Sequence, residues 1–340
     1  MNKQKMNLRY MYWALPCMLL FAGCENEISQ DTENKEPVEL QIDPMVATTR
    51  SAIQEATSMQ KVAVYATGTD YTDAKTNNYA VYTYSSSKWG NSGTDKIYLT
   101  NAEATIYGYY PTIPKHDADL NISVTLLEGT DATTITAVDN AASGSTAIAS
   151  AAGEVDCMWA KKVEKVSNAS EKSSVKLVMN HALAMVSFQV YKDASYQGAG
   201  SLTKFVVENA ASSNVLSKGT NPKMRITDGM LTPGAAQNAK YTRTILNGYT
   251  LTADKGTSRK FSILVLPIND AIGTDKIKAT FTVDGADYSV NLKQPTANSG
   301  KWLAGSNHLY TVKLGGTEVS ITEVEVTKWT EVAGGDLDIK

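Results

Sequence analysis

The sequence has few of the residues from which metal centres, catalytic sites and nucleic-acid interfaces are built. Its 340 residues include only three histidines, and none lies at metal-ligand spacing from another histidine or a cysteine. It contains no Gly-x-Ser-x-Gly nucleophile motif and no glycine loop of the phosphate-binding type. The net charge of -3 provides no basic face for nucleic acid. We therefore expect no enzyme, no cofactor, no metal site and no nucleic-acid partner. A hydrolase stays open as an alternative because carboxylates are plentiful, and it is the weakest alternative because no catalytic set is recognisable.

Cysteine is equally scarce, with Cys17, Cys24 and Cys157 as the complete set. Cys17 lies in an apolar leader, and the residues before Cys24 point to lipid attachment. Cys157 then has no cysteine partner, so an exported chain must be stabilised by core burial without a disulfide. Because apolar residues flank Cys157, we interpret it as a small buried hydrophobic residue.

The only long apolar run is at the start of the chain, and it is too short to be a comfortable membrane span. Three basic residues precede the apolar stretch Met11–Ala22, which indicates a signal peptide over residues 1–23. Small residues at 22 and 23 precede Cys24, as a lipoprotein signal peptidase requires. We expect Cys24 to carry lipid; the alternative is an ordinary signal peptide cut near Ala22.

What the sequence has in abundance is period-2 alternation of apolar and polar residues, and no long amphipathic helix interrupts it. Turn residues separate the runs at a density typical of sandwiches, so we expect an all-β fold. A polar stretch at 165–174 is the expected boundary between two domains. Residues 277–283 and 288–292 form the best hairpin, with a turn at Gly285-Ala286. Strands are expected at Val38–Ile42, Val62–Thr67, Tyr79–Ser85, Ile97–Thr100, Thr105–Tyr110, Ile122–Leu126, Met158–Ala160, Val175–Val178, Ala184–Val190, Leu202–Glu208, Met224–Thr227, Tyr249–Ala253, Phe261–Pro267, Ile277–Val283, Tyr288–Leu292, Tyr310–Leu314 and Val319–Val326.

The first of these strands has features of a detachable element. Val38, Leu40 and Ile42 alternate with polar residues, which predicts one buried face, and the strand should stop at Pro44. Small and polar residues then surround Arg50. A strand followed by a flexible arginine site could be cut away, and its removal would expose an edge that recruits another strand.

The C-terminal segment beyond Gly316 is the expected donor of that second strand. Val319 and Ile321 share one face and Val324 and Val326 the other, so we expect a bulge near Thr322-Glu323. Leu337 and Ile339 then alternate with charged residues, after a possible glycine hinge at 334–335.

The remaining candidates have simpler interpretations. His181 and His308 are expected to be structural, hydrogen-bonded imidazoles rather than ligands. Exposed tryptophans could bind glycan on a sandwich face, with Trp89 in a loop as the best of them and Trp159 and Trp302 as the others.

Five segments together resemble the fimbrillins of Bacteroidetes, the FimA- and Mfa-like fimbrial subunits. They are the leader ending at Cys24, the early strand with Thr48-Thr49-Arg50-Ser51, the aromatic strand Ala104–Pro111 that closes on proline, the His-Ala-Leu-Ala motif and apolar strand in Asn180–Phe188, and Lys301–Gly305 with Tyr310–Val312.

The resemblance implies two transthyretin-like β-sandwich domains in tandem, which we place at residues 51–170 and 171–340, with residues 24–50 as tether, first strand and propeptide. It implies a lipidated precursor at the outer membrane and cleavage between Arg50 and Ser51 by a processing protease. The strand holding Val38, Leu40 and Ile42 would leave, and the C-terminal donor strand of another fimbrial subunit (about 319–340; Val319, Ile321, Val324, Val326, Leu337 and Ile339) would fill the groove.

The function implied is therefore that of a structural pilus subunit that supports adhesion at the cell surface. A complete C-terminal segment and an arginine at position 50 favour a stalk subunit over a tip or anchor subunit. The alternative is a monomeric surface lipoprotein that binds glycan.

Overall fold

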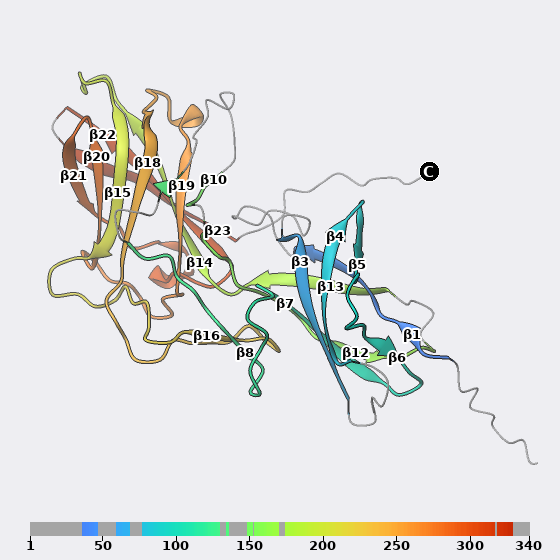
Figure 1. Cartoon of the computed structure of the whole chain (residues 1–340). Helices are drawn as coiled ribbons and strands as arrows, with labels where there is room; N and C mark the ends of the chain where they lie inside the picture. Colours follow the sequence, from blue (N-terminus) through green and yellow to red (C-terminus); the bar gives the residue numbers. More distant parts are fainter. Residues whose placement is uncertain are drawn as a thin grey trace, which may run out of the picture. The chain divides into compact units, whose positions relative to one another are not determined.

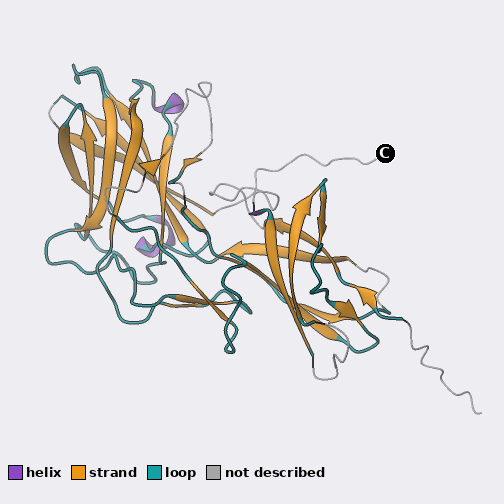
Figure 2. Cartoon of the chain, viewed as in Figure 1, coloured by secondary structure: helices purple, strands orange, loops and turns teal. Residues whose placement is uncertain are grey.

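Strands form nearly all of the regular secondary structure in the described residues, as the sequence predicts. The computed structural model describes residues 36–46, 59–68, 77–129, 134–135, 148–151, 153–169, 174–316 and 318–328. Helix is represented there by the short 3-10 turns η1 (Lys255–Thr257) and η2 (Ala297–Gly300), drawn in purple in Figure 2. Within the described ranges, no helix has the length and hydrophobicity to cross a membrane. The leader and Cys24 lie outside these ranges.

The first part of the chain builds an 8-stranded sheet in the order β2-β13-β11-β7-β3-β4-β5, with β12 also paired to β7. Its inward side chains form one hydrophobic core. A separate pair, β1 (Val38–Glu39) and β6 (Tyr98–Leu99), contributes to the same core through Leu99. The strands of the large sheet, several of them labelled in Figure 1, are β2 (Gln41–Val46), β3 (Lys61–Thr67), β4 (Tyr79–Ser85), β5 (Lys88–Gly90), β7 (Ala104–Tyr110), β11 (Met158–Ala160), β12 (Val163–Val166) and β13 (Ser174–His181).

The second part of the chain packs two 5-stranded sheets against each other. Phe188 of one sheet lies 5.5 Å, centroid to centroid, from both Phe205 and Phe281 of the other, so aromatic rings fill the space between the layers. The first sheet has the order β10 (Ile148–Ala149), β19 (Lys260–Val265), β14 (Ala184–Lys192), β22 (Ser306–Leu314), β23 (Val319–Lys328). The second has the order β21 (Ala286–Asn291), β20 (Ile277–Val283), β15 (Ser201–Asn209), β18 (Lys240–Thr250), β9 (Thr134–Ile135).

A 3-stranded sheet, β17 (Leu231–Thr232), β16 (Lys223–Arg225) and β8 (Asn121–Ser123), supplies part of a third hydrophobic cluster. Cys157 belongs to this cluster and is fully buried, and its burial raises the pKa of the thiol above the ordinary value. The interpretation of Cys157 as a buried hydrophobic residue is confirmed.

The predicted hairpin is confirmed, with its turn one residue earlier than expected. Strands β20 and β21 pair from Lys278 with Asn291 to Val283 with Ala286, which leaves Asp284 and Gly285 as the loop. Both loop residues have positive φ, 49° and 81°, as a type I′ turn requires.

Three other strands differ from the prediction. Trp89 lies in strand β5, not in a loop, and its ring packs 5.4 Å from that of Tyr84. The strand expected at 249–253 instead runs over β18, because Arg243 in its middle is buried and paired with Glu154 at 2.8 Å, so a buried position looks polar in the sequence. The run expected at 175–178, after the predicted domain boundary at 165–174, is part of strand β13. This strand pairs with β2 and β11 and so belongs to the 8-stranded sheet of the first part of the chain.

Candidate strand-exchange site

The chain ahead of Arg50 is held by main-chain hydrogen bonds to two different strands, one along each of its two parts. We call residues 38–46 the plug segment. Its first part, β1, pairs antiparallel with β6, and the amide of Leu40 donates to the carbonyl oxygen of Ile97 at 2.8 Å. Its second part, β2, pairs in parallel with β13, from Gln41 opposite Ser174 to Val46 opposite Met179. The plug segment thus joins the small β1–β6 pair to one edge of the 8-stranded sheet.

Two apolar side chains of the plug segment are part of the core. Leu40 is 0% exposed and Ile42 is 5% exposed, and both belong to the cluster that includes Val62 and Tyr82. The Tyr82 hydroxyl donates to the carbonyl oxygen of Leu40 at 2.7 Å, which fixes the main chain where it passes between the two pairings. Burial of two such side chains is worth about 3–6 kcal/mol.

The structure corrects two details of this strand. Val38 is 39% exposed and does not share the buried face of Leu40 and Ile42. The strand does not stop at Pro44 but continues to Val46, and Pro44 is buried opposite Leu177. Proline is accommodated because β2 is an edge strand, where the missing N–H costs no ladder hydrogen bond on the open side.

Polar contacts at the start of the plug segment are few and lie near the surface. The carboxylate of Glu39 forms an ion pair with the Lys96 ammonium at 2.7 Å, and this hydrogen bond raises the pKa of Lys96 above its ordinary value. The Asn168 side-chain amide donates to the carbonyl oxygen of Glu36 at 3.2 Å. The segment is therefore held mainly by its strand pairing and by Leu40 and Ile42.

Arg50, Ser51 and Cys24 lie outside the described residues. The chain is described up to Val46 at the end of β2 and again from Met59, before β3. Arg50 thus falls in the connection that follows the plug segment directly.

The first half of the expected donor, which holds Val319, Ile321, Val324 and Val326, is an ordered strand of its own sheet. Strand β23 pairs antiparallel with β22 at the edge of the sheet. Thr311 pairs with Glu323 and Val312 with Ile321, so Thr322 is the extra residue of a bulge, as predicted. Ile321 is 4% exposed and packs in the core, with Val319 and Val324 partly buried against it.

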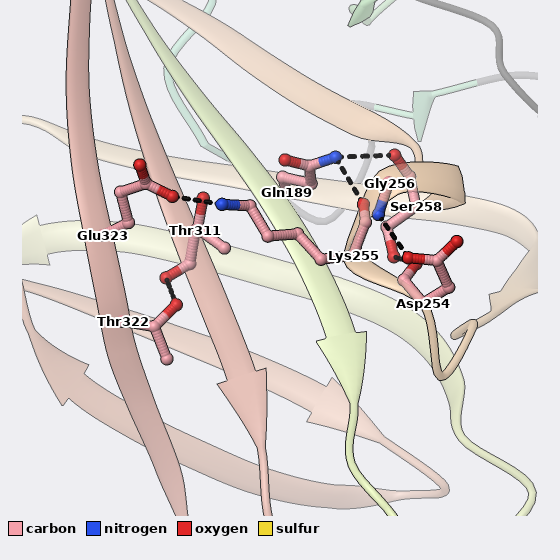
Figure 3. A network of polar contacts seen from close by, with 8 residues as sticks. All are labelled: Gln189, Asp254, Lys255, Gly256, Ser258, Thr311, Thr322 and Glu323. Atoms are coloured by element: carbon pink, nitrogen blue, oxygen red, sulfur yellow. Dashed lines mark hydrogen bonds and ion pairs between the residues drawn. The ribbon is translucent and has the colours of Figure 1, made fainter.

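Side-chain contacts fix the same strand to its neighbours, as Figure 3 shows. Lys255 forms an ion pair with Glu323, and this hydrogen bond raises the pKa of Lys255. The carbonyl oxygens of Lys255 and Ser258 accept from the Gln189 amide at 2.8 and 3.2 Å, which ties the η1 turn to β14. The Lys293 ammonium donates to the carbonyl oxygen of Ile321 at 2.7 Å. Strand β23 is therefore well integrated into its own sheet.

The remaining donor residues, Leu337 and Ile339, lie outside the described residues. The two halves of the expected donor are thus distinct: an embedded strand, β23, and the residues after Lys328, which we call the terminal tail (residues 329–340).

The structure also places the alternative sites. Trp302 is fully buried and its indole N–H donates to the Tyr310 hydroxyl at 3.1 Å, so it is not the exposed aromatic that glycan binding needs. Trp89 and Trp159 are both partly buried, and each packs against a different hydrophobic cluster.

The two histidines that the sequence analysis interpreted as structural lie in different surroundings. His181 is buried and its Nδ1 lies 2.6 Å from a carboxylate oxygen of Asp156, so the structural interpretation is confirmed. His308 is fully buried, but neither ring nitrogen has a hydrogen-bond partner among the described residues, and burial lowers its pKa to about 4.

Comparison with known proteins agrees with this architecture. The family model for fimbrillin-like proteins matches residues 49–329. A crystal structure from Bacteroides uniformis, described as that of a cell adhesion protein, is 19% identical, has a TM-score of 0.57, and aligns over 86% of this chain and 99% of that chain. A fimbrial protein from Bacteroides vulgatus is 13% identical, has a TM-score of 0.50, and aligns over 87% of this chain and 100% of that chain. No curated protein sequence matches. The family match covers most of the sequence, and the chain therefore belongs to the fimbrillin-like family.

Proposed function

We propose that this chain is a structural subunit of an adhesive fimbria that polymerises by exchange of a β-strand. In this proposal the precursor is exported as a lipoprotein with lipid on Cys24, a protease cuts between Arg50 and Ser51, and the plug segment leaves. The C-terminal segment of another subunit then enters the vacated place. The chain is organised as two β-sandwich domains of the transthyretin type, with residues 51–340 as the mature subunit.

The observation that carries the proposal is the seating of the plug segment. Its two short strands carry the buried side chains of Leu40 and Ile42, β2 lies at a sheet edge, and the connection holding Arg50 follows directly. Removing it would uncover the main-chain groups of β6 and β13 and the apolar places of Leu40 and Ile42. Such an edge favours pairing with another strand, because the exposed donors, acceptors and apolar surface are all satisfied by the incoming chain.

Two of the three arginines among the described residues lie within strands, whereas the third, Arg259, is partly buried between η1 and β19. Arg243 is fully buried in β18, and Arg225 lies in β16 with an ion pair to Asp228. An arginine-specific protease would therefore meet ordered strand at these two positions.

The test is controlled cleavage of the purified precursor. Brief treatment with an arginine-specific protease should produce a new N-terminus at Ser51, shown by mass spectrometry, and convert the monomer into polymers, shown by light scattering and electron microscopy. The Arg50→Gln variant should stay monomeric under the same treatment. Deletion of residues 319–340 should permit cleavage but prevent polymer growth. Cleaved protein that keeps its C-terminal segment and remains monomeric would rule out the proposed assembly.

The glycan-binding alternative has weaker support. Of its three tryptophans, Trp302 is fully buried, and Trp89 and Trp159 are partly buried and pack against hydrophobic clusters.

A further inference from the structure

The sequence of the terminal tail repeats the sequence of the plug segment. Residues 39–43 read Glu-Leu-Gln-Ile-Asp, and residues 336–340 read Asp-Leu-Asp-Ile-Lys. An acidic residue, a leucine and an isoleucine thus recur in the same order and at the same spacing.

In the plug segment these three positions are the ion-paired residue and the two side chains of the hydrophobic cluster; Pro44 is also buried, and the pairing with β13 continues to Val46. The acidic residue, Glu39, pairs with Lys96 at 2.7 Å. Leu40 and Ile42 are the two buried side chains of the core. Val38 is 39% exposed, so the glycine that stands before Asp336 in the tail would lose little burial in its place.

We propose that residues 336–340 of one copy replace residues 39–43 of the next copy in the same direction and register, with Leu337 in the place of Leu40 and Ile339 in the place of Ile42. This inference rests on the proposed strand exchange and specifies its partner residues. Asp336 then faces Lys96, and residues 338–340 pair in parallel with β13 from Ser174 to Lys176, as residues 41–43 do, while the places of residues 44–46 stay open.

Other registers fit the vacated place less well. A shift by one residue would turn Leu337 and Ile339 to the outward face, because side chains alternate along a strand. A shift by two, with Leu337 in the place of Ile42, would put Ile339 in the place of buried Pro44, which lies outside the hydrophobic cluster, and Gly335 in the place of Leu40, which is 0% exposed and belongs to that cluster. A core position that glycine leaves unfilled is costly because the surrounding structure relaxes only partly.

Donation by the terminal tail does not require β23 to leave its sheet. Ile321 stays in its own core, and the contacts of Glu323 and Ile321 with Lys255 and Lys293 are kept. The residues between Lys328 and Asp336 can span about 26 Å when extended, at about 3.3 Å per residue.

Disulfide cross-linking reads the register directly. In the proposed register Asp338 takes the place of Gln41, whose Cα partner on β13 is Ser174. Asp338→Cys with Ser174→Cys should therefore give a ladder of linked subunits after cleavage. Asp338→Cys with Lys176→Cys is the matched control: a two-residue offset adds about 6.6 Å along the strand, which takes the Cα atoms beyond the roughly 7 Å limit of a disulfide. Cys157 is buried, and Cys17 and Cys24 precede the cut.

Charge reversal gives a second, independent measurement. Lys96→Glu and Asp336→Lys should each slow polymer growth about twofold to fivefold, as expected for one partly exposed ion pair, and the double variant should recover most of the rate. Asp338→Lys provides the matched reversal at a position that does not face Lys96.

The outcomes separate the two proposals. A ladder from the 338–174 pair with recovery in the double charge variant supports the register. Polymers that form but link through the 338–176 pair, or through neither pair, would overturn the register and leave strand exchange standing. If the unmodified cleaved protein forms no polymer, the proposed function itself fails, and the register with it.

Discussion

Leu40 gives the sharpest test of whether the plug segment is a structural part of the precursor. Its side chain is 0% exposed and lies in the core of the first sheet, although the proposed cleavage at Arg50 would detach the segment that holds it. Leu40→Ala removes the buried leucine atoms and leaves a cavity, because Val62 and its neighbours stand on strands that cannot close it. The expected loss in the free energy of unfolding is about 2–5 kcal/mol.

Val38→Ala is the matched control in the same segment. Val38 is 39% exposed, so its truncation should change the free energy of unfolding by about 0.5 kcal/mol or less. The assay is urea denaturation of the uncleaved precursor, followed by tryptophan fluorescence. Trp89 packs against the same core as Leu40, so its emission reports on this part of the chain.

The comparison of the two variants decides the matter. If Leu40→Ala lowers the free energy of unfolding no more than Val38→Ala does, the plug segment does not contribute to the core in solution. Removal of the plug segment would then uncover no stabilising site for an incoming strand.

Three further predictions concern features outside the strand-exchange site. The pKa of His308 is about 4 in the folded chain against an ordinary 6.5, so below pH 6.5 the unfolded state binds a proton that the folded state does not. The free energy of unfolding should therefore fall by about 2 kcal/mol between pH 7 and pH 5. Urea denaturation of His308→Leu at the two pH values should lack this loss. Arg243→Met leaves the Glu154 carboxylate buried without its cation and should lower the free energy of unfolding, measured by urea denaturation, by about 3–5 kcal/mol. The double variant Arg243→Met with Glu154→Leu should recover most of this loss. A double variant as unstable as the single one would contradict this account. Gly285→Ala, at φ +81° in the β20–β21 turn, should lower the free energy of unfolding by about 1–2 kcal/mol. Gly90→Ala in β5, where a Cβ meets open space and φ is not positive, should leave it nearly unchanged. Equal effects of the two substitutions would show that turn geometry is not the cause.

The local patterns of the sequence were sufficient for the all-β class and for most strands. Alternation at 277–283 and the turn residues after it predict the hairpin to within one residue, because both signals are local. The bulge at Thr322 is likewise local, since the period-2 alternation of apolar residues shifts by one between Ile321 and Val324, and the bulge keeps both side chains against the same core. The resemblance to fimbrillins also rests on the sequence, and the family match confirms it.

Those local patterns could not predict which strands that are distant in the sequence pair with each other. The chain at 240–248 looks polar, yet β18 is a buried strand because Glu154, far away in the sequence, neutralises Arg243. The exposure of Val38 and the burial of Pro44 depend on where the plug segment passes from β6 to β13, which no alternation rule contains.

The sequence by itself determined most of the strands and the motif shared by residues 39–43 and 336–340, because these are properties of neighbouring residues. Only the tertiary structure decided that Leu40 and Ile42 are the buried pair, that Glu39 faces Lys96, and that β23 stays paired within its own sheet. The physical reason is that burial and pairing depend on which distant strands lie alongside a segment, and that choice is made by the packing of the whole chain.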